Sequence, residues 1–357
     1  MTDPAHNETD EILKRLEKRI SEEYALAVKE VQEKLEDYLR RFEVKDKTWR
    51  EWVKIGYKTK DEYKQWKVGQ MAIGRRWTQL RDNLAEDFHN ANMIARSIIF
   101  EHMPEVYAIN HDYGVYEIEH GLNLDTSCIL YDRQTVERLF DDNEKLYHDP
   151  GMATSQRIAA GIDIRWNRQQ IQSAMLQAIL QGETIPAIAS RIANQVGESN
   201  RKAAIRNART ITTGVENRGR VDSYKRAQEM GIDLRQQWVA TLDSRTRHEH
   251  RLLDGQTAKV GGYFEVEGDK IRYPGDPEAP GYLVYNCRCT LIAYMKGFER
   301  DMSDLNGRNT KNFDNMSYEE WKNERESTSK SINEPEEKSE NIKNAYTAEY
   351  RRKKKRK

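Results

Sequence analysis

The stretch that decides the fold is "RKAAIRNARTITTGVENRGRVDSYKRAQEMG", residues 201–231. It has the length and spacing of a helix, but one of its stripes is polar and consists of Arg206, Thr210, Thr213, Glu216, Asn217 and Arg220. Threonine and asparagine are poor helix formers unless hydrogen bonds hold them. The polar stripe also borders apolar positions such as Ile211 and Val215. We therefore favour a buried polar network over the alternative, a solvated face.

Upstream of this stretch the sequence predicts long amphipathic helices. Apolar residues recur every three or four positions from Thr9 to Phe42 and again from Asp61 to Met103, where Pro104 is expected to end the second helix. The short runs "YGVYEIEHGLNL" and "CILYD", between Tyr107 and Asp132, alternate as strands or extended connectors do. We expect Cys128, in the second run, to be a small core residue.

Three tryptophans, Trp49, Trp52 and Trp66, lie among lysines between the two predicted helices. Aromatic and basic residues together are typical of surfaces that contact nucleic acid or membrane. Large aromatic side chains more often bury themselves where helices cross, and we favour that interpretation.

Downstream, a helix is expected from about Met152 to Gly182, and Pro186 suits the first turn of a short helix, "PAIASRIANQVG". Beyond Gly231 the sequence changes to strand and turn patterns, including the hairpin "GYFEVEGDKIRYPG" and a closing strand, "YLVYNCRCTLIAY". The predicted fold class is α+β. An elongated, mainly helical N-terminal region (1–150) precedes a compact α+β domain with a small antiparallel sheet (151–298) and a disordered charged tail (299–357).

Composition excludes several classes of protein. Lysine plus arginine equals aspartate plus glutamate at 59 each, so the overall charge indicates no particular partner. No apolar run is long enough to cross a bilayer, and the first residues lack the order of a secretory signal, so we expect a cytosolic chain without membrane contact. Three cysteines do not make a disulfide framework, and thiols or metal thiolates are expected instead.

The tail holds few apolar residues and cannot bury enough surface to offset its ordering entropy. It ends in seven consecutive basic residues, namely Arg351, Arg352, Lys353, Lys354, Lys355, Arg356 and Lys357. Such a cluster is typical of an arm that contacts nucleic-acid phosphates. A merely solubilising end is the alternative.

Two short motifs supply candidate metal ligands. His248 and His250 lie in "DSRTRHEHRLLDG", and Cys287 and Cys289 lie in "NCRC". Zinc prefers four nitrogen or sulfur ligands, and residues two apart in an extended strand point to the same side, so each pair could reach one structural zinc ion. Against this, strong zinc motifs usually space their cysteines more widely.

The competing interpretation of the same segment is a closed polar corner. Asp243, Asp254 and Gly255 are typical turn residues, and Arg245 or Arg288 could pair with either aspartate to tie the loop to the last strand.

Catalysis is the third possibility for this segment. The zinc-deaminase pattern fails in its spacing, and no oxyanion-hole signature accompanies a Cys–His pair. We therefore expect no catalytic residue.

Five segments, taken in their order along the chain, resemble the phage head morphogenesis family, the minor head proteins similar to phage Mu protein F. They are "ARTITTGVENRGR", "WVATLDSRTRHEHRLLDGQ", a hairpin, a proline-rich loop and "NCRCTLIAY". The resemblance covers about Ile171 to Tyr294. It implies a non-enzymatic capsid component of the virion that is present in the host cytoplasm during assembly. It also implies a role near the portal in head assembly, DNA packaging or ejection.

The partners that this resemblance implies are portal protein, major capsid protein or scaffolding protein, with DNA contact through the basic tail. The alternative function is a head-associated, metal-dependent, nuclease-like enzyme that uses His248, His250, Cys287 and Cys289.

Overall fold

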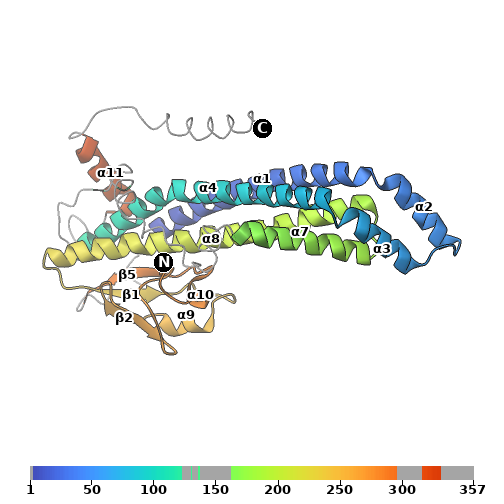
Figure 1. Ribbon diagram of the computed structural model, residues 1–357. Helices are drawn as coiled ribbons and strands as arrows, with labels where there is room; N and C mark the ends of the chain where they lie inside the picture. Colours follow the sequence, from blue (N-terminus) through green and yellow to red (C-terminus); the bar gives the residue numbers. More distant parts are fainter. Residues whose placement is uncertain (1–2, 123–129, 131–135, 137–161, 296–315, 331–357) are drawn as a thin grey trace.

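The computed structural model describes residues 3–122, 130, 136, 162–295 and 316–330. It shows an elongated bundle of long helices with a small sheet-containing module against one end (Figure 1). The helices of the bundle are α1 (Pro4–Arg40), α2 (Glu43–Lys54), α3 (Lys60–Met71), α4 (Arg75–Leu122), α7 (Ile162–Leu180) and α8 (Ile185–Glu229). None of the described helices contains a stretch long and apolar enough to cross a membrane.

Local signals fix where several of these helices begin. Asp3 caps α1 by accepting a hydrogen bond from the His6 amide, with Pro4 in the first turn. Thr59 and Glu62 form a capping box at the start of α3. Thr184 caps α8, and Pro186 occupies its first turn as the sequence predicts.

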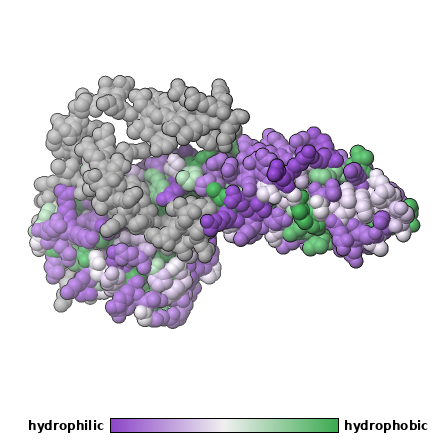
Figure 2. Space-filling model, viewed as in Figure 1, coloured by the Kyte–Doolittle hydropathy of each residue, from purple (hydrophilic) through white to green (hydrophobic). Residues whose placement is uncertain are grey.

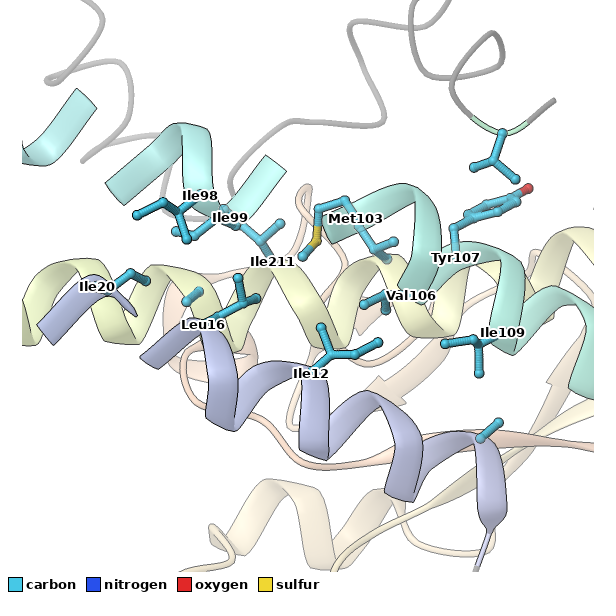
Figure 3. Close-up of a cluster of buried hydrophobic side chains, with 14 of the residues drawn as sticks. Ile12, Leu16, Ile20, Ile98, Ile99, Met103, Val106, Tyr107, Ile109 and Ile211 are labelled. Carbon is cyan, nitrogen blue, oxygen red and sulfur yellow. The ribbon is translucent and has the colours of Figure 1, made fainter. Parts of the chain in front are cut away.

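The core of the bundle lies between α1, α4, α7 and α8. Figure 3 shows part of it, where labelled side chains of α1, α4 and α8 gather, among them Ile12, Leu16, Ile20, Ile98, Met103, Val106 and Ile211. α8 packs along both α1 and α4. The predicted division at residue 150 stays a prediction, although helices from both sides of it share this core.

The second predicted helix differs from the structure in its bounds. The predicted single helix is two helices, α3 and α4, separated at Ala72–Gly74. α4 continues through Pro104 to Leu122, so the prediction of strands or connectors from Tyr107 onward is wrong as far as Leu122. A proline removes one helical hydrogen bond, but residues on both sides of Pro104 bury apolar side chains in the shared core. Tertiary packing therefore outweighs the proline. Cys128 lies outside the described residues.

α8 is one continuous helix of 45 residues, so the predicted break after Gly197 is also wrong. A Cβ at Gly197 would lie 2.1 Å from Val28 Cγ2 of α1. This glycine serves close helix packing rather than helix termination.

The three tryptophans between the long helices are half-buried and pack against one another where α2 and α3 meet. The Trp49 and Trp66 rings stack at 5.5 Å, and Trp49 contacts Trp52 edge-on at 5.4 Å.

The module at the other end holds a three-stranded antiparallel sheet in the order β2–β1–β5 and a separate β3–β4 hairpin. The strands are β1 (Arg235–Val239), β2 (Thr257–Lys259), β3 (Phe264–Val266), β4 (Asp269–Ile271) and β5 (Thr290–Tyr294), and short helices α9 (His248–Leu253) and α10 (Gly281–Val284) lie between them. Trp238 of β1 pairs with Leu291 of β5, and both are fully buried. The α+β class and the small antiparallel sheet are confirmed.

Two further expectations need correction. The predicted closing strand over 282–294 is interrupted: α10 ends at Val284, Asn286 adopts a positive φ of 52°, and only Thr290–Tyr294 is strand. Within the predicted disordered tail, Tyr318–Lys330 form helix α11.

α11 is ordered because it buries aromatic side chains. Trp321 is 1% exposed and donates a hydrogen bond to Glu119 of α4 at 2.8 Å. The basic residues 351–357 lie outside the described residues.

Candidate functional site

The polar stripe of α8 is buried from Thr210 to Arg220, and it binds the backbone that carries the two cysteines. Thr213 Oγ1 donates to the Cys287 carbonyl at 2.8 Å, and Asn217 Nδ2 donates to the Cys289 carbonyl at 3.3 Å. Arg220 Nη1 donates to the next alternate carbonyl, Leu291 O, at 3.0 Å. Extended residues two apart advance about 6.6 Å, and helical residues three or four apart advance about 4.5–6 Å, so the two spacings are similar.

The same stripe also accepts hydrogen bonds from this segment. Leu291 N–H donates to Asn217 Oδ1 at 2.8 Å, and Thr290 Oγ1 donates to Glu216 at 3.2 Å. Asn286 N–H donates to Thr210 Oγ1 at 3.3 Å, across the turn where Asn286 has its positive φ. The buried network that the sequence favours is therefore present, and its role is to hold the turn and strand in register on α8.

Arg220 lies at the centre of this network and is fully buried. Its Nη2 is 2.6 Å from Asp3 and 3.7 Å from Glu216, and the guanidinium also donates to Asn110 Oδ1 at 2.9 and 3.1 Å. The start of α1, the middle of α4 and strand β5 thus meet at one side chain.

His6 adds a titrating group to the network. Its Nδ1 lies 2.7 Å from Glu216, whose carboxylate raises the pKa of His6 to about 9 against the opposing effect of burial. A folded-state pKa above the unfolded value of 6.5 gives stability that is complete below about pH 6.5 and is lost as the pH rises through about 9.

Between about pH 6.5 and about pH 9, we expect the free energy of unfolding to fall by roughly 1–3 kcal/mol more in the wild type than in His6→Gln. Urea midpoints measured for both proteins between these pH values check the prediction. Parallel pH profiles would rule out the linkage.

The predicted polar corner is organised around Asp243 and Arg288. The guanidinium donates two hydrogen bonds to the carboxylate, at 2.7 and 2.8 Å, and holds the pKa of Asp243 well below its usual range. The Arg245 side chain is 77% exposed and its Nη2 is 3.6 Å from Asp243, so Arg245 contributes mainly its amide, which donates to Asp243 at 2.8 Å. Asp254 accepts from the Ala240 amide at 2.8 Å, and Gly255 has the positive φ of 77° that its turn needs.

The structure brings three of the four predicted metal ligands together. Nδ1 of His250 lies 3.1 Å from Cys289 Sγ and 3.6 Å from Cys287 Sγ. The side chain of His248 is 68% exposed and faces Glu267 at 3.8 Å. The strand geometry assumed for the histidine pair explains the difference: both histidines lie in helix α9, where residues two apart point to different sides.

The His250, Cys287 and Cys289 group is closed to solvent, with exposed fractions of 3%, 3% and 2%. Hydrogen bonding from the Cys287 thiol is the main cause that lowers the pKa of Cys289 to about 5, while burial raises the pKa of Cys287. A DNA phosphate cannot approach buried side chains of this kind, so the nuclease-like alternative gains no support from this geometry. These three residues could hold a metal ion.

Two neighbours of this group were not identified from the sequence. His250 Nε2 lies 2.9 Å from the Leu283 carbonyl, and the Trp238 ring contacts the His250 ring edge-on at 5.9 Å. Leu283 contributes a backbone atom, which no residue pattern marks. Trp238 precedes the corner in the sequence, but only the β1–β5 register brings it beside Cys289.

Comparison with known proteins adds to these observations. The family model described as phage Mu protein F like protein matches residues 169–292. Minor head protein GP7 of Bacillus phage SPP1 is 25% identical over 293 residues, which are 81% of this chain and 85% of GP7. No solved structure matches.

Two other relatives match over shorter stretches. An NAD(+)–arginine ADP-ribosyltransferase, EFV, of Enterococcus faecalis is 30% identical over 154 residues, and an uncharacterized protein of Haemophilus influenzae is 29% identical over 131. The chain spans only 31% and 26% of their lengths. The family match over residues 169–292 and the alignment with GP7 over 81% of the chain support a place among the phage minor head proteins similar to phage Mu protein F.

Proposed function

We propose that the protein acts in phage head morphogenesis at or near the portal, as a non-catalytic component that docks on the portal protein through its helical bundle. The observation that carries this proposal is the alignment with the minor head protein GP7, which extends over 85% of that relative. Family membership also supports a location in the virion. The activity named for the Enterococcus faecalis relative is not proposed for this chain, because the alignment spans less than a third of that protein.

The bundle offers a docking surface at its free end. α2 and α3 form the end farthest from the sheet module (Figure 1), and Figure 2 shows apolar atoms exposed there. We call Val44, Ile55 and Tyr57 the apolar tip; they are 77%, 71% and 67% exposed. All three lie in α2 or directly after it, and exposed apolar side chains of this kind favour protein contact. We propose the portal protein as the occupant, since GP7, with which 81% of the chain aligns, is a minor head protein.

The basic tail is the proposed DNA contact. Residues 351–357 would neutralise phosphates in a DNA-filled head, which gives an affinity that falls steeply with salt. Packaging and ejection are the stages at which such contact would matter.

Co-purification tests the docking proposal. The tagged wild type is expected to co-purify with portal protein from cells that assemble heads. Changing Val44, Ile55 and Tyr57 together to aspartate is expected to reduce the recovered portal at least tenfold. The matched control is Leu242→Asp, which alters a residue of the sheet module that is 63% exposed, and its recovery should equal that of the wild type.

Two outcomes would contradict the proposal. Wild-type recovery by a correctly folded triple variant, with the fold checked by circular dichroism, would exclude the apolar tip as the docking surface. Recovery of the wild type only as free protein would overturn the portal role itself.

A further inference from the structure

The His250, Cys287 and Cys289 side chains form a compact set of one nitrogen and two sulfur atoms, all within 4.8 Å of one another. We propose that they bind one zinc ion, which fastens α9 to the turn before β5, and that His248 takes no part. This inference is independent of the docking role proposed above.

The distances suit a zinc ion without large movement. Tetrahedral zinc with bonds of about 2.3 Å to sulfur and about 2.05 Å to nitrogen requires a sulfur–nitrogen separation of about 3.6 Å. The two separations here are 3.6 Å for Cys287 and 3.1 Å for Cys289. Of the two nitrogen–sulfur separations, only that of Cys289 therefore needs to change, by about 0.5 Å.

The orientation of His250 also suits a metal ligand. A carbonyl oxygen can only accept a hydrogen bond, so the 2.9 Å contact between His250 Nε2 and Leu283 O places a proton on Nε2. The contact of the same nitrogen with Arg247 Nη2, which would require a lone pair there, is longer at 3.4 Å. In the neutral ring this leaves the lone pair on Nδ1, the atom that faces both sulfurs. Histidine ligands of metals are commonly fixed in this way, by a backbone carbonyl on the other ring nitrogen.

Two N–H groups are available to the sulfurs. The Cys289 amide donates to Cys287 Sγ at 3.4 Å. The Trp238 indole N–H is buried without an oxygen or nitrogen acceptor among the described residues, in the same cluster as both cysteines. A buried donor in this position requires a partner, and an electron-rich metal thiolate provides one.

The chemistry of the donors selects the metal. Two thiolates and an imidazole favour zinc over magnesium, calcium or manganese, which prefer oxygen ligands. Three protein ligands leave one tetrahedral position for water. Because Cys287 and Cys289 are held on α8 by Thr213 and Asn217, the ion would cross-link α9 to the long helix through this strand.

The test uses the full-length protein purified under reducing conditions with zinc supplied. Elemental analysis is expected to find about one zinc per chain. His250→Ala and Cys289→Ser should each lower that content at least tenfold, whereas His248→Ala, two residues away on the same helix, should keep it. Cobalt exchanged for zinc in the wild type should give the near-ultraviolet charge-transfer band of thiolate ligation.

Either of two results overturns the proposal. The first is wild-type protein with only trace zinc and no cobalt–thiolate band, together with two freely alkylated thiols, which would identify a metal-free thiol pair. The second is equal loss of zinc in His248→Ala and His250→Ala. If the ligand variants fail to fold, the cobalt spectrum of the wild type decides the matter.

Discussion

Arg220→Ala is expected to lower the free energy of unfolding by about 3–5 kcal/mol, the usual cost of removing one partner of a buried ion pair. The guanidinium is fully buried and lies between Asp3 and Glu216. Its removal leaves a carboxylate without its cation and the Leu291 carbonyl without its donor. Because three segments meet at this side chain, the loss would loosen the attachment of the sheet module to the bundle.

Arg218 provides the matched control for this change. It lies on the same helix and pairs with Asp222 at 2.8 Å, but its side chain is 30% exposed. Arg218→Ala should therefore cost about 1 kcal/mol or less. Urea unfolding with an unchanged m-value measures both effects. Similar losses for the two variants would show that the buried network does not hold the module.

Gly219→Ala is expected to destabilise the protein by about 1–3 kcal/mol through overpacking. A Cβ at this position would lie 2.7 Å from the Tyr107 carbonyl oxygen and 3.1 Å from the His111 amide nitrogen. Both atoms belong to the backbone of α4, so no side-chain rotation relieves the clash. α8 and α4 must move apart to accept even one methyl group.

The control is a second helical glycine that nothing crowds. A Cβ at Gly69 of α3 would meet no atom within 4 Å. Gly69→Ala should therefore raise the stability by up to about 1 kcal/mol, because alanine favours the helix. Thermal unfolding of both variants checks the contrast. Destabilisation by Gly69→Ala to the same extent would point to a general intolerance of alanine rather than to helix contact.

The sequence predicted those features that depend on local periodicity. The amphipathic repeats predicted long helices. The threonines and asparagine in the polar stripe of α8, which are poor helix formers, indicated a buried network of hydrogen bonds. Prediction was wrong where tertiary packing outweighs a local signal: Pro104 is a helix breaker by itself, yet α4 continues through it because its flanks are buried.

At the candidate metal site too, the sequence predicted the residue types but not which of them come together. The residue types indicated nitrogen and sulfur ligands near one another, but the choice among them depended on the backbone geometry of "RHEH". A strand would have directed both histidines to one side, and a short helix directs only His250 to the cysteines. The contribution of Trp238 follows from strand register, which no spacing in the chain reveals.

The continuity of α8 has a mechanical consequence. A helix of 45 residues is about 68 Å long, and this one packs along α1 and α4 of the bundle and also against β5 of the sheet module. A force applied at the apolar tip would rotate the helix as a whole instead of bending it at a hinge. We expect movement at one end of the helix to displace the other end as a rigid body, because the hydrogen-bond network around Arg220 keeps the sheet module attached to α8.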